Sequence, residues 1–242
     1  MSIVVYLVRH GEVEHHRTDV SVTPRGQAQA EAAGAALASR IAGGDAVSIQ
    51  HSPVIRVRET AELLRTALAS ALVAGRVDRV AISPLHLDPS LCNVRFILGP
   101  GQEPEEPSLL YDTINTQAYI ESASPARAEF YRGFWSSRDP MGYWLTHDSA
   151  GAAETPEFVL ERVRERLRGL FANHADKAEG RLHWIGVTHS GAMRDVLRAA
   201  FGDDPGEPDF CEVIVVEPSG HADQATVSYR GRSAPLVLAD RR

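Results

Sequence analysis

The chain has 242 residues, of which 43% are hydrophobic and 24% charged, a composition typical of a globular protein with one sizeable core. The formal net charge is -7 and the isoelectric point about 5.8, which argues against an extended surface for nucleic acid or anionic membranes. The first apolar run is too short for a signal peptide and no run is long enough for a membrane span, so we expect a cytoplasmic protein. The two cysteines, Cys92 and Cys211, fit no metal-binding spacing and no disulfide framework.

The chain begins with a strand signal followed by a helix signal. Residues 2–8 form a short β-branched apolar run that predicts a strand. Residues 23–37 are rich in alanine and glutamine and predict a helix. Thr23 stands at the cap position of this helix and Pro24 in its first turn, the usual places for these residue types.

The same order of signals is repeated once in the next stretch. Residues 46–50 predict a second strand. Ser52 and Pro53 repeat the cap-plus-proline signal, so we expect Ser52 to cap a long helix over residues 54–72. A short strand is predicted near residues 80–82.

The middle of the chain, residues 84–153, differs from the rest. It contains many prolines, most of the aromatic residues and an acidic patch of Glu103, Glu105 and Glu106. We interpret it as an insertion or lid of short helices within a single domain spanning residues 1–242. Its aromatic residues either line a substrate pocket or pack the insertion onto the core, and the sequence leaves both alternatives open.

Helix and strand signals alternate again in the last third. Residues 155–171 predict a helix with an apolar stripe at helical spacing, formed by Val159, Val163, Leu167 and Leu170. Strands are predicted at 182–188 and 211–216, a helix at 190–201, and an edge strand at 226–230. Helices placed between strands predict an α/β fold: a three-layer sandwich with a mostly parallel central sheet and an inserted lid segment.

The first predicted strand ends at three residues suited to a phosphoryl group. Arg9 offers a planar fork of donors, and His10 offers a ring nitrogen that can attack phosphorus. Gly11 allows the backbone to approach a ligand closely. In open α/β sheets, ligands bind in the crevice at the carboxyl ends of the strands.

Two further strand ends carry the same kind of chemistry. His189 follows one strand, and Ser190 then opens a helix whose free N–H groups and dipole favour an anion. Arg56 lies one turn inside the helix that follows the strand at 46–50. Because parallel strands end at one edge of the sheet, two histidines and two arginines are expected to converge on one phosphate-sized spot.

These residues fall into motifs that resemble the histidine phosphatase superfamily, with its phosphoglycerate-mutase-like fold. The motifs are Arg9-His10-Gly11, the helix-opening segment from Asp19 to Ala28, Ser52-Pro53 with Arg56 and Thr60-Ala61, Val187-Thr188-His189-Ser190-Gly191, and Glu154-Thr155 before a helix. They cover both ends of the chain but little of residues 84–153. Several motifs in the right order are a far more specific signal than any one of them.

The resemblance implies a role for each matched residue. His10 is the expected nucleophile, which forms a phosphohistidine, and Arg9, Arg56 and His189 hold the phosphoryl oxygens. Substrate contacts are expected from Gly11, His16 and Ser190. No metal and no other cofactor is required. His10, His15 and His16 also permit a zinc site, which we rank far lower.

One position departs from the family pattern. The family usually carries a general acid in a Leu-x-Glu segment, and the corresponding residues here are Leu91-Cys92-Asn93. An asparagine amide cannot donate a proton to a leaving oxygen. The candidates for a relocated acid are Asp88, Glu121, Asp148 and Glu154. Of these we favour Glu154, because its segment comes near the pocket in the family.

The leading hypothesis is a metal-independent phosphatase that hydrolyses a small phosphorylated metabolite through a phosphohistidine on His10. One alternative is phosphoglycerate-mutase-like phosphotransfer. Another is a phosphate-binding pseudoenzyme, because Asn93 occupies the usual acid position. The expected partner is a small phosphorylated molecule rather than nucleic acid or a membrane. The sequence leaves the substrate and the oligomeric state open.

Overall fold

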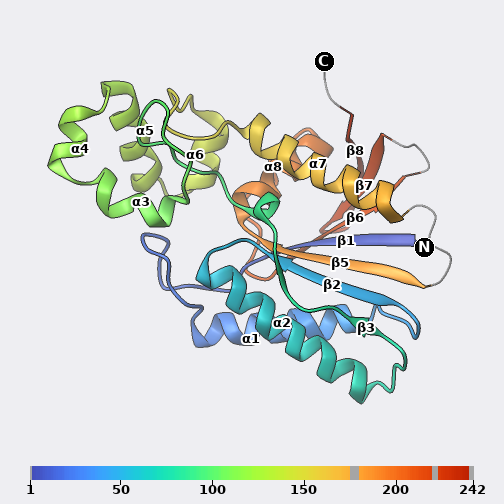
Figure 1. Cartoon of the computed structure of the whole chain (residues 1–242). Coiled ribbons are helices and arrows are strands. Elements are labelled where there is room, and N and C mark those ends of the chain that lie inside the picture. Colours follow the sequence, from blue (N-terminus) through green and yellow to red (C-terminus); the bar gives the residue numbers. More distant parts are fainter. Residues whose placement is uncertain (1, 175–179, 220–222, 240–242) are drawn as a thin grey trace.

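The computed structural model describes residues 2–174, 180–219 and 223–239, and an eight-stranded sheet runs through the middle of this part of the chain (Figure 1). Its strands are β1 (Ser2–Arg9), β2 (Ala46–His51), β3 (Ala81–Ile82), β4 (His86–Leu87), β5 (Arg181–Thr188), β6 (Val213–Pro218), β7 (Gln224–Tyr229) and β8 (Arg232–Val237). The strand order is β3-β2-β5-β1-β6-β7-β8, and β4 also pairs with β2. The sequence gives no clear signal for the two-residue β4.

The sheet has a parallel half and an antiparallel half. In the parallel half, β5 lies between β1 and β2, and β2 also pairs with β3 and β4. The strands β6, β7 and β8 extend the sheet in antiparallel order beyond β1. Arg9 at the end of β1 is in register with Thr188 at the end of β5. The predicted α/β fold is thereby confirmed, and His10 and His189 follow two neighbouring strand ends.

The predicted strands differ from the observed ones mainly in the antiparallel half. Strand β6 begins at Val213 rather than at Cys211, because Cys211 has a φ of 59° and donates its N–H to the carbonyl oxygen of Arg9. Strand β7 is not the edge strand, since β8 pairs with its outer side. The sequence does not predict β8, which is mostly exposed and contains Pro235, so its hydrophobic alternation is weak.

Two helices cover each face of the sheet. The helices are α1 (Pro24–Ala38), α2 (Ile55–Ala74), α3 (Pro107–Ile114), α4 (Gln117–Ser122), α5 (Pro125–Ser136), α6 (Pro140–Thr146), α7 (Pro156–His174) and α8 (Ser190–Phe201), with a 3₁₀ turn η1 (Pro89–Leu91). On β1, Val4, Tyr6 and Val8 belong to the apolar cluster with α1 and α2. Ile3, Val5 and Leu7, whose side chains point to the other face, belong to the apolar cluster with α7 and α8. This alternation along one strand produces the three predicted layers.

The four helices α3 to α6 gather at the carboxyl-end side of the parallel strands (Figure 1). They share an apolar cluster that includes Phe96, Phe130, Phe134 and Trp144 and reaches Val159 of α7. Most of the aromatic residues therefore pack these short helices onto the rest of the chain. Within the described ranges, no helix is long and apolar enough to cross a membrane.

Candidate active site

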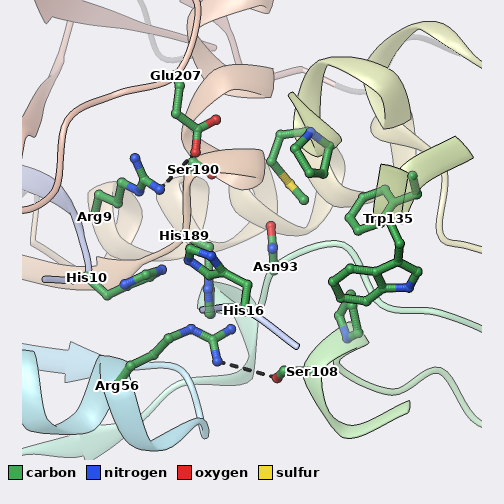
Figure 2. A pocket seen from close by; sticks show the side chains of 14 residues that line it. Arg9, His10, His16, Arg56, Asn93, Ser108, Trp135, His189, Ser190 and Glu207 are labelled. Atoms are coloured by element: carbon green, nitrogen blue, oxygen red, sulfur yellow. Dashed lines mark hydrogen bonds and ion pairs between the residues drawn. The ribbon is translucent and has the colours of Figure 1, made fainter. Parts of the chain in front are cut away.

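A cavity of about 100 Å³ lies where the strand ends meet the helices α3 to α6 (Figure 2). Its lining comes from both ends of the chain and from its middle: Arg9, His10, His16, Arg56, Asn93, Pro107, Ser108, Phe134, Trp135, Pro140, Met141, His189, Ser190 and Glu207. The structure thus brings together six of the eight site residues that the sequence predicts. Gly11 and Glu154 are not part of this lining.

Gly11 shapes the turn after β1 rather than the cavity wall. Its N–H donates to Oγ1 of Thr60, at 2.9 Å, so this donor is not free for a substrate. A methyl group on Gly11 would lie 2.6 Å from the carbonyl oxygen of Gly26 in α1. The structure therefore leaves no free N–H on Gly11 for the expected substrate contact. The glycine is needed because the turn packs directly on the first turn of α1.

His10 has the tautomer and charge state that a nucleophile needs. Its Nδ1 lies 2.8 Å from the carbonyl oxygen of Gly11, so Nδ1 carries the hydrogen and donates it. The other ring nitrogen, Nε2, is then left with a lone pair. Burial, followed by the charge of Arg56, lowers the pKa of His10 well below its ordinary value. The imidazole is therefore neutral at physiological pH.

Two buried arginines, Arg9 and Arg56, flank His10 with donors that no described residue satisfies. Their side chains are 7% and 3% exposed. The Nε atom of each is buried and has no hydrogen-bond partner among the described residues. Arg9 is held through both Nη atoms, by Glu207 and the carbonyl of Pro208, and Arg56 is held through Nη1, by Asp19 and Ser108. Two fixed guanidinium groups with spare N–H donors suit an anion with several oxygens.

His189 is oriented by a residue that the sequence assigned to another role. Oγ of Ser52 lies 2.8 Å from Nε2 of His189. The prediction that Ser52 caps α2 is therefore wrong. The cap residue is Val54, and the carboxylate of Asp19 accepts the N–H of Ile55 at 3.0 Å. Burial, followed by the charge of Arg56, lowers the pKa of His189 well below its ordinary value.

The two remaining predicted contacts, His16 and Ser190, lie at opposite sides of His10 and His189 (Figure 2). The ring centroid of His16 is 5.5 Å from that of His10. Although part of the His16 side chain is exposed, desolvation and the charges of Arg56 and Arg9 lower its pKa to about 4. Ser190 is the first residue of the 12-residue helix α8, whose N-terminus adds a positive electrostatic potential.

The wall opposite the histidines is apolar. Phe134 and Trp135 of α5 and Pro140 and Met141 of α6 form it, together with Pro107 at the start of α3. The middle-segment aromatics therefore do not share one role, and Phe134 belongs to both the cavity lining and the apolar cluster. Trp135 lines the cavity, whereas Tyr131 is buried in the apolar cluster behind it.

Glu154, the favoured acid, has a structural role. Its carboxylate accepts hydrogen bonds from the backbone N–H and side chain of Arg95 and from Nη1 of Arg162. The backbone carbonyl of Glu154 accepts from Nε1 of Trp144. These contacts hold the 93–96 segment to α7, outside the cavity. The structure therefore does not place the Glu154 carboxylate, the favoured acid, in the cavity lining.

The other three acid candidates also lie outside the cavity lining. Asp88 pairs with Nε of Arg166 at 2.6 Å, Glu121 is exposed on α4, and Asp148 accepts the N–H of Ala150. A carboxylate does line the cavity at Glu207, which the sequence analysis did not single out. It pairs with Arg9 at 2.9 Å and with Arg194 at 3.3 Å.

A second carboxyl group near the site was also missed: Glu106 directly precedes the lining residue Pro107. The sequence places it in an acidic patch of a proline-rich segment, a pattern more typical of a solvated loop. In the structure it is 4% exposed, and its Oε1 lies 3.7 Å from Nε2 of His189. The only sequence signal was its position one residue before the Pro107 that begins α3.

No group of three or more histidine, cysteine, aspartate or glutamate residues in the described part of the chain could hold a metal ion. His15 is not in the cavity lining, whereas His10 and His16 are. Both positive side chains of the site are arginines, which bind anions rather than cations. The donor set therefore fits a phosphoryl group.

Comparison with known proteins agrees with this geometry. Residues 5–85 match the model of the histidine phosphatase superfamily (branch 1). No curated protein matches the chain significantly.

Among solved structures, the fold is similar to that of mycobacterial hydrolase 1, with 18% identity, a TM-score of 0.56, and coverage of 96% of this chain and 99% of that chain. It is also similar to a mycobacterial glucosyl-3-phosphoglycerate phosphatase in complex with inorganic phosphate, with 18% identity, a TM-score of 0.55, and coverage of 98% and 99%. A phosphoserine phosphatase mutant from Entamoeba histolytica in complex with phosphoserine gives 16% identity, a TM-score of 0.53, and coverage of 94% and 95%. The matched segment contains His10 and Arg56, and the fold of the described chain is similar to that of these solved structures.

Proposed function

We propose that the protein is a metal-independent phosphatase that hydrolyses a small phosphorylated metabolite through a phosphohistidine on His10. The observation that carries the proposal is the pair of buried, unpartnered Nε–H donors of Arg9 and Arg56 beside a neutral imidazole. Buried donors without partners cost about 1–3 kcal/mol each, and a bound phosphoryl group would satisfy both. The neighbouring folds named as phosphatases support the same reaction class.

The arrangement supports an in-line attack. Nε2 of His10 has the lone pair, since Nδ1 donates to the Gly11 carbonyl. Arg9 and Arg56 neutralise the phosphoryl oxygens that would otherwise repel the nucleophile, and they stabilise the charge of the transition state. His189, whose ring centroid is 5.5 Å from that of His10, offers a further donor to an oxygen. Water then attacks the phosphohistidine and releases phosphate.

The size and lining of the cavity support a small substrate. A volume of about 100 Å³ accommodates a phosphoryl group and the first atoms of its leaving group. The net charge of -7 is unfavourable for nucleic acid or an anionic membrane as partner. We place the reaction in the cytoplasm, because both cysteines are free thiols, the usual state in a reducing compartment.

The proposal is tested with p-nitrophenyl phosphate and purified protein. We expect His10→Ala to lower turnover by more than about 10³-fold, as removal of a nucleophile does. His15→Ala is the matched control, since His15 is exposed and does not line the cavity. An alkaline quench of the wild type should trap a phosphoryl group on His10, and activity should survive chelators. Retained turnover in His10→Ala would contradict the proposal.

The same preparation separates the two alternatives. A mutase would convert a phosphorylated sugar or glycerate into a positional isomer faster than it releases phosphate. A pseudoenzyme would bind inorganic phosphate, measured by calorimetry, without cleaving any ester. We expect release of free phosphate to dominate.

A further inference from the structure

Hydrolysis of an alkyl phosphate by this site, the function proposed above, needs a proton source that the cavity lining does not provide. The departing alkoxide must be protonated, and a general acid contributes about 10²–10⁴-fold to such a step. The lining offers the amide of Asn93, which has no acidic proton, and the carboxylate of Glu207, which is paired with two arginines. A group outside the lining must therefore supply the proton.

Glu106 is placed to do so. Its Oε1 lies 3.7 Å from Nε2 of His189 and accepts the backbone N–H of Asn93 at 3.2 Å. Its Oε2 is buried and has no partner among the described residues. Pro107 and Ser108, the next residues along the chain, line the cavity. The carboxyl group is thus fixed behind His189, with one oxygen uncommitted.

Charged and titratable groups face Glu106 from several segments. They are Arg56 of α2, Asp19 of the preceding loop, Arg162 of α7, and Cys92 and Arg95 of the 92–95 segment, besides His189 itself. Burial raises the pKa of Glu106 to about 7, although Arg56 and the Asn93 N–H oppose the shift. The carboxyl group is therefore partly protonated near neutral pH, unlike an exposed glutamate.

We propose that Glu106 is a positioning residue that supplies the leaving-group proton through His189. In this proposal the Ser52 hydroxyl donates to Nε2 of His189, and the ring hydrogen stands on Nδ1, for which the described residues provide no partner. Nδ1–H passes its proton to the ester oxygen while the P–O bond breaks and the bond between phosphorus and Nε2 of His10 forms. In the same step Nε2 of His189 gives up the hydrogen bond from Ser52 and takes the carboxyl proton of Glu106. The products are a neutral alcohol, a neutral His189 and a Glu106 carboxylate.

The second half of the reaction reverses this transfer. Water attacks phosphorus, and its proton goes to Nδ1 of His189. The Nε2 proton returns to Glu106, and the electron pair of the P–N bond returns to Nε2 of His10. The distance of 3.7 Å exceeds a hydrogen bond by about 0.5 Å, a gap of the size that closes when substrate binds.

The test compares, in each variant, two probes that differ in their need for an acid. Glu106→Gln keeps the shape of the side chain and removes its proton. We expect kcat/KM for propyl phosphate to fall by about 100-fold and that for p-nitrophenyl phosphate by less than threefold, since nitrophenolate leaves without protonation. Glu105→Gln is the matched control, because Glu105 is exposed on the same segment. Glu106→Asp should retain part of the propyl phosphate activity.

The pH dependence of kcat/KM distinguishes a proton-supplying Glu106 from a Glu106 that only supports the fold, because a structural role would not change this dependence. For the wild type, kcat/KM for propyl phosphate should fall above pH of about 7, and this limb should be absent in Glu106→Gln. Equal losses on both probes, or an unchanged limb, would overturn the inference and leave the phosphohistidine mechanism standing. Failure of the wild type to cleave either probe would overturn the proposed function and this inference with it.

Discussion

Oγ of Ser52 lies 2.8 Å from Nε2 of His189, although 137 positions separate the two residues in the chain. Both side chains are almost fully buried. A neutral imidazole carries one hydrogen, so the group that contacts one nitrogen decides what the other can do. The Ser52 hydroxyl therefore determines whether His189 can donate toward the cavity.

Ser52→Ala should weaken catalysis without preventing folding. Loss of this hydrogen bond leaves His189 free to change tautomer and to rotate. We expect kcat to fall by about tenfold, which corresponds to about 1.4 kcal/mol, with little change in KM. Steady-state kinetics with p-nitrophenyl phosphate measures both constants. Ser90→Ala is the control, since Ser90 bonds to Asp88 at the 3₁₀ turn, away from the cavity lining. An unchanged kcat would show that Ser52 does not set the His189 tautomer.

Glu207→Gln should tighten the binding of phosphate. The Glu207 carboxylate lies 2.9 Å from Nη2 of Arg9 and lines the same cavity, so it repels a phosphate dianion. Its neutral analogue should lower the inhibition constant of inorganic phosphate by about fivefold, corresponding to about 1 kcal/mol between partly solvated charges. Glu212→Gln, which also breaks an arginine pair, at Arg230, is the control. Weaker phosphate inhibition would mean that Glu207 mainly orients Arg9.

Trp135→Ala should affect the leaving group rather than the phosphoryl group. Trp135 belongs to the apolar wall opposite the histidines. Removing its ring should raise KM for p-nitrophenyl phosphate by about tenfold and leave phosphate inhibition within twofold, because only the aryl group contacts the wall. Phe158→Ala is the control: Phe158 is 56% exposed on α7. An equal effect on phosphate would indicate that the whole site had shifted.

Gly11→Ala should destabilise the fold as well as the site. The added methyl group would lie 2.6 Å from the Gly26 carbonyl oxygen, a backbone atom that cannot move without displacing α1. We expect the free energy of unfolding to fall by about 2 kcal/mol. Gly169→Ala is the matched control, since no atom lies within 4 Å of its added methyl and helix propensity favours alanine there. Urea unfolding compares the two, and equal stability would contradict this packing argument.

The elements that the sequence predicts well have strong periodic signals or clear boundaries. The β-branched run of β1 and the apolar stripe of Val159, Val163, Leu167 and Leu170 are both buried as predicted. Strand β8 was missed because it is an exposed edge strand that contains a proline, so it has neither a strong hydrophobic periodicity nor a clear boundary. Strand ends in a parallel sheet meet at one edge, which is why His10, Arg56 and His189 could be grouped without a structure.

The site residues that the structure places differently from the sequence analysis depend on contacts between distant segments. Ser52 has the sequence of a helix cap, yet the cap contact comes from Asp19 and its hydroxyl serves His189. Glu154 precedes a helix at the expected place, but two arginines hold it outside the cavity. Glu106 was not predicted to lie near the site, although it does, since nothing in the local sequence distinguishes it from the exposed Glu105. The direction of a side chain in a proline-rich segment is fixed by tertiary packing alone.

Glu106 should also make stability depend on pH. Its pKa of about 7 in the folded chain exceeds its ordinary value of 4.5, so the folded state binds the proton more tightly. The contribution of this group to the free energy of unfolding is therefore complete below about pH 4.5 and is lost as the pH rises through 7. The Glu106→Gln variant has no titrating side chain at position 106. Relative to the wild type, we expect the variant to gain about 3 kcal/mol of stability between pH 4.5 and pH 8.

Urea unfolding of both proteins at several pH values measures this difference. Asp195, whose pKa burial also raises to about 7, titrates in both proteins and cancels in the comparison. Glu105→Gln is the control for a substitution on the same segment, since Glu105 is exposed in the folded chain. A difference between Glu106→Gln and the wild type that stays constant across the range would mean that Glu106 titrates alike in the folded and unfolded states. In that case the carboxyl group would be ionised at neutral pH and could not hold the proton that His189 needs.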